Sequence, residues 1–516
     1  MNCANAHSVD WFNTGGNWAN PKQSGKIGAG DTVHLCGTFT GIAGQNLLVI
    51  QNNGAAGSPI IIYFEPGVIL QAPYWGTNDG TNPSGGAISV GSHNYIIVDG
   101  GSNGKIQNTL NGTNGTGCIA AICPGGPCTQ NGISAGVFVG HGAHDIEIKN
   151  LMISDMGVRT PCSLASCDAG GYGIFVQYAG SNILVHHNTT TYAHNIFFVN
   201  YDGNVDNWQI YNNTMSLASI PLVIATAYGK TLTNLKIYNN ELKDTYVGQD
   251  PDNMHHLNGI MIFCSSTLKG EISGAFYNNY IHGDFGGALC GWEGHISNWF
   301  QVDFGNSPSG CAATFDIYNN LLVSEVTGNH PMNGYIGVRG RPSSENKVST
   351  FRIYNNTIDG GGNGNFGMGL GEIADENITV QNNIIKGVGY AAYVNTGVAL
   401  TADHNFYYDI SLMPDAFWSS ETNAGVYTNK TLTDWHNLGR DLAVSNTTTD
   451  PNLNSDYTLQ SSSPAKDAGV SLSSYLSTDK NGISRPQGSA WDIGAYEYVQ
   501  GRDTTPPAAP RGLAIQ

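Results

Sequence analysis

Charged side chains are scarce in this chain, at 12% of its 516 residues. The 21 lysines and arginines are outnumbered by 39 aspartates and glutamates, which gives a net charge of −18. The basic residues form no cluster, so nucleic acid and anionic membrane surfaces are poor partners. An acidic surface also repels polyanionic sugars unless a cation bridges them. No apolar run is long enough to span a bilayer, which excludes membrane insertion through a helix.

Patterns typical of helices are missing as well. Apolar residues occur in short runs without helical periodicity, while glycine is abundant, with 68 residues. With 40% hydrophobic residues, the chain can still bury a large core. These features predict an all-β, turn-rich protein that forms a single elongated domain rather than several globular ones.

One short phrase returns along residues 185–408: an apolar residue, then a tyrosine, then two asparagines. Its tyrosines lie 27, 39, 41 and 36 residues apart, which is typical of a solenoid whose repeats bury their apolar faces only by stacking. Asparagine suits the turns between short strands because it tolerates the left-handed backbone conformation. Stacked asparagines can also hydrogen-bond from one coil to the next. The phrase is complete at Tyr211, Tyr238, Tyr277, Tyr318 and Tyr354, and a variant follows at Gln381.

This pattern resembles the right-handed parallel β-helix of pectate lyases, polygalacturonases and related secreted enzymes that degrade polysaccharides. The repeat itself predicts a parallel β-helix of three-strand coils with an asparagine ladder. Its handedness follows from the resemblance and from the right-handed rule for parallel crossovers. A left-handed hexapeptide helix would need a strict six-residue period, which the sequence lacks.

Composition divides the chain into four segments. The C-terminal closing segment resembles that of secreted bacterial β-helix proteins, and the tail resembles a linker into a fibronectin type III module that would follow it. The expected segments are an N-terminal cap and first coil at 1–75, the β-helix at 76–430 with long wall loops at 76–132 and 245–350, the closing segment at 431–500, and the linker at 501–516.

Ten cysteines occur in local groups, one of which joins Cys3 with Cys36. The grouping and the even count predict disulfides and therefore an oxidising, extracellular location. The chain opens without a signal peptide, so we expect the leader of a secreted protein to have been removed.

One strand per coil is expected to align on a single face of the β-helix. Extra loop length on consecutive coils would build a groove beside that face. The longest insertions fall between residues 245 and 349, so the site is expected near residues 245–375. The aligned strands are predicted at 173–178, 195–201, 221–227, 259–265, 288–293, 335–340, 368–372 and 392–396.

Three charged residues end successive strands of this predicted face: Glu293, Arg339 and Glu372. In register, the two carboxylates would lie about 9.6 Å apart with the guanidinium between them. Inverting glycosidases hold their acid and base carboxyl groups about 6.5–9.5 Å apart. The pattern therefore predicts a catalytic pair, and the alternative is a surface ladder that only stabilises the stack.

A polar turn before residue 259 contains Asp252, His255 and His256, which could act as general acid or base or could hold a cation. Aromatic side chains at strand ends and in the wall loops could pack against sugar rings, with polar groups beside them. The predicted substrate-binding residues are Tyr178, Tyr201, Trp292, Trp299 and Arg341.

The leading hypothesis is a secreted glycoside hydrolase that cleaves an extracellular polysaccharide, with Glu293, Glu372 or a wall-loop aspartate as acid and base. The resemblance to pectate lyases implies an alternative, in which calcium neutralises a uronate and Arg339 removes the proton in a β-elimination. A third hypothesis is a non-catalytic glycan-binding or adhesive solenoid, because a fold alone does not establish an activity. In each case the expected partner is a polysaccharide, the protein is expected to be monomeric, and calcium is the cofactor that the resemblance suggests.

Overall fold

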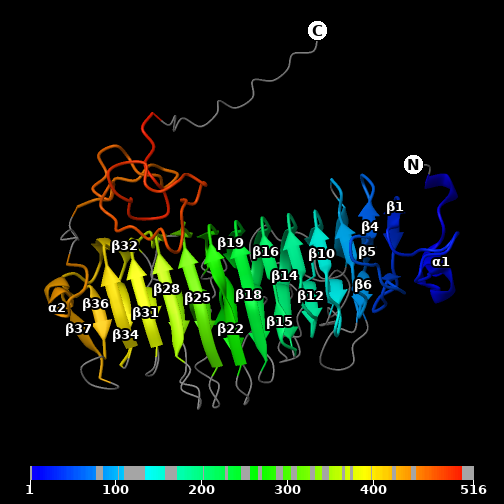
Figure 1. Cartoon of the computed structure of the whole chain (residues 1–516), viewed down its shortest axis with the longest axis horizontal. Coiled ribbons are helices and arrows are strands. Elements are labelled where there is room, and N and C mark those ends of the chain that lie inside the picture. Colours follow the sequence, from blue (N-terminus) through cyan, green and yellow to red (C-terminus); the bar gives the residue numbers. More distant parts are fainter. Residues whose placement is uncertain are drawn as a thin grey trace, which may run out of the picture.

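The chain winds into a long stack of parallel strands, coloured from blue to orange along the sequence (Figure 1). Each turn of the chain adds one strand to each of three ladders, which we call faces one, two and three, so the predicted all-β parallel β-helix is confirmed. None of the described helices is long and apolar enough to cross a membrane. The computed structural model describes residues 3–76, 85–102, 104–109, 134–156, 171–201, 203–226, 230–245, 256–264, 270–285, 295–303, 311–325, 332–339, 348–362, 366–371, 376–396, 398–420, 426–442 and 449–501.

Face one contains the strands that end in the tyrosine–asparagine phrase. Successive strands pair in register, so that Tyr211 lies beside Tyr238 and Ile210 beside Ile237. The short strand β15 (Val205–Asp206) also pairs with β18. In chain order, face one consists of β1 (Thr32–Leu35), β4 (Ile60–Phe64), β7 (Ile96–Asp99), β10 (Ile146–Lys149), β13 (Ile183–His186), β16 (Trp208–Tyr211), β18 (Thr231–Tyr238), β22 (Gly270–Tyr277), β25 (Cys311–Tyr318), β28 (Ser349–Tyr354), β31 (Glu376–Gln381) and β34 (Val398–Asp403).

Face two follows the asparagine turn. Two of its strands are long enough to continue into face three, which is why these two faces join into one sheet. Face two consists of β2 (Thr38–Thr40), β5 (Ile69–Ala72), β8 (Lys105–Asn108), β11 (Met152–Ser154), β14 (Thr189–Tyr201), β17 (Thr214–Thr226), β19 (Glu241–Thr245), β23 (Tyr280–Gly283), β26 (Leu321–Ser324), β29 (Thr357–Asp359), β32 (Ile384–Val388) and β35 (Phe406–Ile410).

Face three completes each coil, and it is the face that carries the candidate site described below. Its last strand pairs antiparallel with β37 (Thr428–Lys430), and the short β20 (His256–Leu257) pairs with the start of β24. Besides the second halves of β14 and β17, face three consists of β3 (Leu48–Val49), β6 (Ile88–Gly91), β9 (Ser134–Val139), β12 (Gly171–Gln177), β21 (Ile260–Cys264), β24 (His295–Asp303), β27 (Met332–Arg339), β30 (Phe366–Leu370), β33 (Tyr390–Val394) and β36 (Phe417–Ser419).

Alternation along each strand places apolar residues inside the coil and polar or aromatic residues outside. In face one, Ile317 and Ile353 are fully buried and lie in register. The tyrosine that follows each of these apolar residues points outward, and Tyr211, Tyr238 and Tyr277 stack with ring centroids 4.8 and 4.9 Å apart. The tyrosines of the phrase are therefore structural, because their ring faces are covered by one another.

The two asparagines of each phrase have different roles. The first adopts a left-handed conformation that turns the chain, with φ of 53° at Asn319 and 50° at Asn355. The second is buried and hydrogen-bonded from coil to coil. Asn320 accepts from the backbone N–H of Asn279 at 3.0 Å and donates from Nδ2 to Asn356 Oδ1 at 2.9 Å. The ladder contains Asn188, Asn213, Asn240, Asn279, Asn320, Asn356, Asn383, Asn405 and, at its end, Asp441.

Removing one member of this ladder is expected to be costly. Asn320→Ala would leave the backbone N–H of Asn279 without its acceptor and would remove the donor to Phe276 O, both in a fully buried environment. Each buried unsatisfied polar group costs roughly 1–3 kcal/mol, so we expect a loss of about 3 kcal/mol or more in the free energy of unfolding, measured by urea denaturation. Asn377→Ala removes an exposed asparagine from β31 and should change stability by less than about 0.5 kcal/mol. Equal losses in both variants would contradict the ladder's role.

The N-terminal end of the stack is partly covered by a short cap. Helix α1 (Val9–Asn13) ends in an asparagine whose Nδ2 donates to Leu47 O and whose Oδ1 accepts from Val49 N–H, both at 2.9 Å. Cys3 and Cys36 form a disulfide, as their grouping predicted. The side chains of the other eight cysteines lie outside the described part of the chain.

The C-terminal end of the stack is closed by helix α2 (Leu432–Asn437). Trp435 stacks on Phe417 of the last coil, with ring centroids 4.0 Å apart. Asp441 then accepts hydrogen bonds from the backbone and side chain of Asn405, which ends the asparagine ladder. The predicted closing segment therefore divides into two parts, because only its first residues lie at the end of the stack.

The second part, residues 449–501, runs back along the stack and is called the return segment here. It covers the turn between faces one and two, and forms the orange-to-red loops above β25–β32 (Figure 1). On the covered coils, strands β26, β32 and β35 carry buried apolar outward residues on face two, whereas on earlier coils these positions hold polar residues such as Thr214 and Lys243. The buried outward residues are Leu321, Val323, Ile384 and Phe406, which pack against Leu459, Ile493 and Ala495.

The return segment also binds the first asparagine of four successive phrases. The side chain of Asn319 donates to Thr478 O at 2.8 Å, and that of Asn382 donates to Val470 O at 2.8 Å. Asn355 donates to Asp492 O at 3.0 Å, and Lys480 Nζ donates to the backbone oxygen of Asn278. Contacts of this kind explain why the return segment follows the stack axis.

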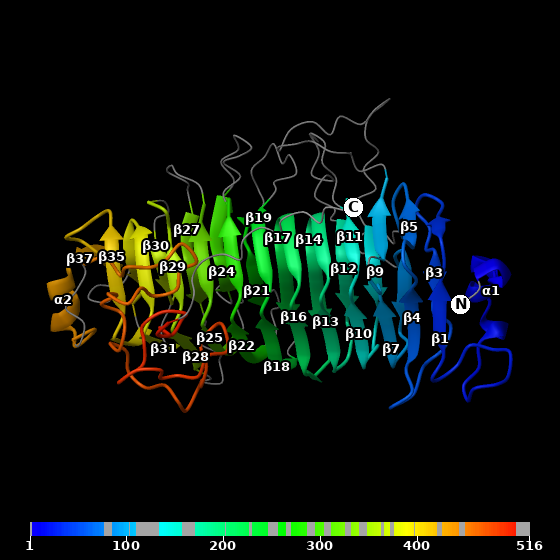
Figure 2. The same ribbon diagram turned by 90° about the horizontal axis from the view of Figure 1, so that it is seen from above.

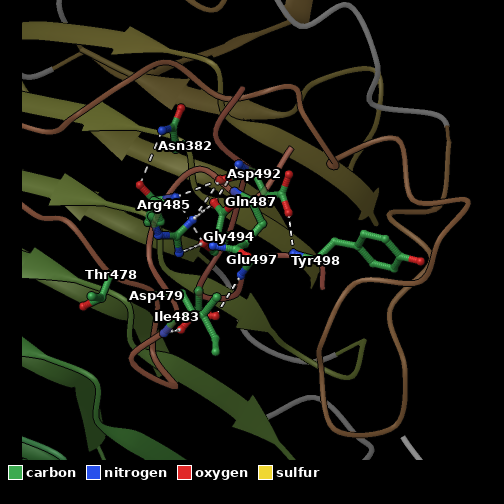
Figure 3. Close-up of polar contacts among 12 residues, drawn as sticks. Asn382, Thr478, Asp479, Ile483, Arg485, Gln487, Asp492, Gly494, Glu497 and Tyr498 are labelled. Atoms are coloured by element: carbon green, nitrogen blue, oxygen red, sulfur yellow. Dashed lines mark hydrogen bonds and ion pairs between the residues drawn. The ribbon is translucent and has the colours of Figure 1, made fainter. Parts of the chain in front are cut away.

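A buried ion pair stabilises the return segment internally. Arg485 Nη1 lies 2.8 Å from Glu497 Oε1, and both side chains are fully buried (Figure 3). The same guanidinium donates to Gly494 O at 2.9 Å and to Asn319 Oδ1 at 3.2 Å, so the ion pair also fixes the segment to the stack. Burial raises the pKa of Asp492, the acidic neighbour of this pair, to about 6.

Candidate functional site

A pocket of about 190 Å³ opens on the outer side of face three, over its last coils. Its lining residues include residues of β24, β27 and β30. These three strands lie side by side (Figure 2). Pairing places Gly337 beside Gly369, and the next two coils place Tyr393 and Trp418 at the same register position. The lining residues are Asn298, Gly337, Arg339, Phe366, Gly369, Tyr393, Trp418 and Tyr427.

The two glycines account for the space. Gly337 and Gly369 place no side chain at this register position on two consecutive coils. A Cβ on Gly369 would meet no atom closer than 3.9 Å, so the space above this residue is open. A Cβ on Gly337 would lie 2.3 Å from Asn298 Nδ2, so the amide of Asn298 occupies the space above that glycine.

Aromatic rings form one side of the pocket. Trp418 and Tyr427 have ring centroids 4.5 Å apart, and Tyr393 lies 5.2 Å from Tyr427 and 5.6 Å from Trp418. Phe366 adds a fourth ring, 5.5 Å from Tyr393. All four side chains are only partly buried. Such rings provide apolar contact area next to polar groups, the usual composition of a small-molecule or sugar site.

The polar side of the pocket contains Arg339, the last residue of β27. Its side chain is 33% exposed, and Nη1 lies 3.8 Å from Oδ2 of Asp303, the residue in register with it on the preceding coil. Asp303 in turn accepts a 2.8 Å hydrogen bond from Gln301 Nε2. Among the described residues, this 3.8 Å contact is the only ion pair of the guanidinium, so it is loosely paired there and can bind an anion in the pocket.

Two tyrosine hydroxyls meet at the edge of the pocket. Tyr393 Oη lies 2.8 Å from Tyr427 Oη, and Tyr427 donates to Asn395 Oδ1. Burial raises the pKa of Tyr393 above its ordinary value, and the hydrogen bond with Tyr427 raises it further. Tyr393 therefore remains protonated near neutral pH and is a hydrogen-bond donor rather than a base.

Arg339 lies at the end of a face-three strand, as the sequence predicted. The residue beside it on the preceding coil differs from the predicted one. The face-three strand of the preceding coil is β24 (His295–Asp303), not residues 288–293, so the residue beside Arg339 is Asp303 rather than Glu293. The predicted Glu293–Arg339–Glu372 ladder is replaced on that side by an Asp303–Arg339 pair. Both segments are apolar enough to form a strand, and the pairing with β21 and β27 selects the second.

Several predicted residues lie away from the pocket. Trp299, expected to bind substrate, is 1% exposed and packs between Phe285 and Tyr335, with centroids 4.6 Å from each, so it belongs to the core. Tyr178 packs against His141 beside β12, five strand spacings or about 24 Å from β27.

Other predicted residues cannot be placed by their side chains. His256 pairs with His295 through the backbone of β20, and Tyr201 ends β14 beside Thr226; their side chains lie outside the described part of the chain. The residues that lie wholly outside it are Glu293, Glu372, Asp252, His255, Trp292 and Arg341.

The sequence interpretation missed Asn298 and the aromatic side of the pocket. A signal for the aromatic side was present: the central outward residue of successive strands changes from Gly337 and Gly369 to Tyr393 and Trp418. No group of three or more histidine, cysteine, aspartate or glutamate side chains suited to a metal ion occurs among the described residues.

The coordinates define a parallel β-helix protein. No protein-family model matches its sequence, and no curated protein matches it. Among solved structures it is similar to pectate lyase Pel9A, with a TM-score of 0.29 and 14% identity over 91% of this chain and 88% of that one. It is also similar to a mannuronic-acid-specific polysaccharide family 6 lyase from human gut microbiota, with a TM-score of 0.26 and 12% identity over 80% and 90% of the two chains.

Proposed function

We propose that this protein is a polysaccharide-degrading enzyme, specifically a lyase, which binds an acidic polysaccharide at the face-three pocket and cleaves it by β-elimination. The observation that carries the proposal is the position of Arg339, a loosely paired cation at the side of an aromatic pocket on an otherwise acidic protein. The sequence interpretation gave elimination as the alternative to hydrolysis. The register of β24 supports elimination, because it places Asp303 rather than Glu293 beside Arg339.

The reaction needs a cation beside the sugar carboxylate. A base removes the proton from the carbon next to the carboxylate, the C–O bond on the adjacent carbon breaks, and a carbon–carbon double bond forms. Negative charge builds up on the carboxylate as the proton leaves, and a fixed positive charge lowers the barrier. Arg339 supplies that charge in this proposal. The proton acceptor is proposed among Asp252, His255 and His256, which the sequence placed in a neighbouring wall loop.

Hydrolysis remains testable through the two glutamates that the sequence singled out. If the pair acts as acid and base, Glu293→Gln and Glu372→Gln should each abolish turnover without unfolding the protein. Calcium dependence also stays a prediction, which is checked by comparing turnover with and without a chelator.

Product analysis on a panel of acidic and neutral polysaccharides tests the proposal directly. Elimination generates unsaturated sugar ends that absorb in the ultraviolet, whereas hydrolysis generates new reducing ends without that absorbance. We expect unsaturated products from an acidic polysaccharide. Reducing ends alone would establish a hydrolase, and retention of the polymer without cleavage would establish a glycan-binding protein.

The aromatic side of the pocket makes a separate prediction. Trp418→Ala should raise KM about tenfold while changing kcat less, because the ring is expected to contribute mainly to binding of the sugar. Tyr475→Ala removes an aromatic ring that is 49% exposed on the return segment and should leave both constants unchanged. An unchanged KM in Trp418→Ala would show that the substrate does not bind at the aromatic side of the pocket.

A further inference from the structure

A second and larger cavity, of about 840 Å³, lies at the opposite end of the molecule, between the N-terminal cap and strand β1. Its lining residues belong to the blue end of the stack, where α1 lies beside the first coil (Figure 1). The volume is within the range of roughly 300–1,000 Å³ that is usual for ligand sites. Apolar residues of the cap and first coil line it, including Phe12, Ile27, Leu35, Phe39 and Leu48.

The outer edge of β1 faces this cavity with unused backbone groups. In a parallel ladder, alternate residues bond to opposite neighbours. The backbone oxygens of Asp31 and Leu35 accept hydrogen bonds from Ile61 and Glu65 on the β4 side. The N–H and C=O groups of Thr32 and His34 therefore point the other way, and they make no hydrogen bond within the described part of the chain. Both residues line the cavity.

The edge of β3, in the same coil, has hydrogen-bond partners in the cap, unlike the edge of β1. At β3, the Asn13 side chain supplies both a donor and an acceptor to the strand edge, as an added strand would. Among the described cap residues, none does this for β1. The cap is nevertheless held close to β1, because a disulfide joins Cys3 of the cap to Cys36, the residue that follows the strand. The cavity therefore lies between a strand edge with unpaired backbone groups and a cap that is covalently attached beside it.

The charge of the cavity contrasts with that of the whole protein. Its lining contains two lysines, Lys22 and Lys26, against one acidic residue, Asp31, although the chain carries a net charge of −18. Lys22 is paired with Asp31, whereas the Lys26 ammonium makes no ion pair within the described residues. A partner with a carboxylate opposite Lys26 is complementary to this lining.

We propose that β1 binds an extended peptide segment with an acidic side chain, which enters the cavity as an additional strand. Unpaired N–H and C=O groups two residues apart on a strand match a polypeptide backbone, which alternates donors and acceptors at the same spacing. The apolar lining would then receive every second side chain of the peptide, and Lys26 would receive the acidic one. This binding is independent of the pocket on face three.

A pair of proline substitutions tests the proposal. Thr32→Pro removes an edge N–H that makes no native hydrogen bond, and proline is tolerated at such a position because the fold loses no ladder bond. Thr40→Pro is the matched control. Thr40 is also an exposed threonine on an outer strand edge of the first coil, but it does not line the cavity. Both variants should keep the melting temperature of the parent within a few degrees, which confirms that the first coil is folded.

The probe is a displayed library of random ten-residue peptides, selected on the full chain. We expect enriched peptides with alternating apolar residues and a glutamate or aspartate, bound about tenfold or more weakly by Thr32→Pro and by Lys26→Glu but equally by Thr40→Pro. Hydrogen exchange should show protection of the amides of residues 32 and 34 in the complex. Absence of enrichment, equal binding to Thr32→Pro, or unprotected amides would overturn the proposal. A concentration-dependent dimer that Thr32→Pro abolishes would assign the edge to a second copy and would also overturn it.

Discussion

Replacing Arg339 with alanine is expected to lower the turnover of an acidic polysaccharide by a factor of about 100 to 1,000, the usual effect of removing one group that stabilises charge in the transition state. The side chain lines the pocket, and its Nη1 lies 3.8 Å from Asp303 Oδ2, so a bound carboxylate can approach the guanidinium. Because the charge is needed most as the proton leaves, the loss should fall on kcat more than on KM. The measurement is the rate at which unsaturated ends form.

Two further arginine variants act as controls. One tests whether the positive charge alone is sufficient, and the other tests whether loss of any arginine lowers turnover. Arg339→Lys keeps the positive charge but not the planar fork, so partial activity is expected. Arg352→Ala removes an arginine that is paired with Asp316 on face one, and turnover should stay at the parental level. If Arg339→Ala retained full kcat/KM on every acidic polysaccharide that the parent cleaves, the pocket would not be the catalytic site.

Arg485→Met is expected to destabilise the return segment by about 3–5 kcal/mol, because it leaves the Glu497 carboxylate buried without its partner. The substitution also removes donors to Gly494 O and Asn319 Oδ1, which connect the segment to the stack. Urea denaturation monitored by hydrogen exchange of residues 449–501 would measure the loss. The asparagine ladder beneath should stay protected at urea concentrations that release the segment.

The double variant Arg485→Met/Glu497→Leu provides the internal control. Removing both charges is expected to recover most of the stability that the single variant loses, since a buried ion pair contributes little net stability over apolar residues of similar size. Lys466→Met, which removes a cation over the ring of Tyr498, should cost less than about 1 kcal/mol. A double variant as unstable as the single one would show that Arg485 acts through its backbone contacts rather than through charge.

The fold could be predicted from the sequence because one signal repeats. Each tyrosine–asparagine phrase specifies the same three events: an inward apolar residue, a left-handed turn residue and a buried amide, as at Ile317, Asn319 and Asn320. The same signal occurs in many successive coils, so it can be recognised in the sequence. Pairing of face one in register then follows, as in Tyr277 beside Tyr318.

The candidate site could be predicted only in part, because face three has no such marker. The spacing between phrases varies from 27 to 41 residues, so sequence alone cannot decide which apolar run of a coil joins face three. On the eighth coil two runs compete, and β24 places Asp303 rather than Glu293 beside Arg339. The same shift brings Trp299 into the core, where it was expected to be in a wall loop.

The return segment could not be predicted because its contacts join residues far apart in the sequence. Asn382 binds Val470, 88 residues later, and Asn278 binds Lys480, 202 residues later. The one local signal was the change of outward residues from polar to apolar, as at Leu321 and Ile384. Such a change indicates that a face is covered but does not identify the covering segment.

The return segment has a mechanical consequence. A plain solenoid has only nearest-neighbour contacts, so its coils can detach one after another from either end. Residues 449–501 bridge the coils from Asn278 to Asn382, and those coils cannot separate until the bridge breaks. Pulling on the two termini should therefore give a series of small extensions from the uncovered coils, followed by one large, abrupt rupture of the bridged coils.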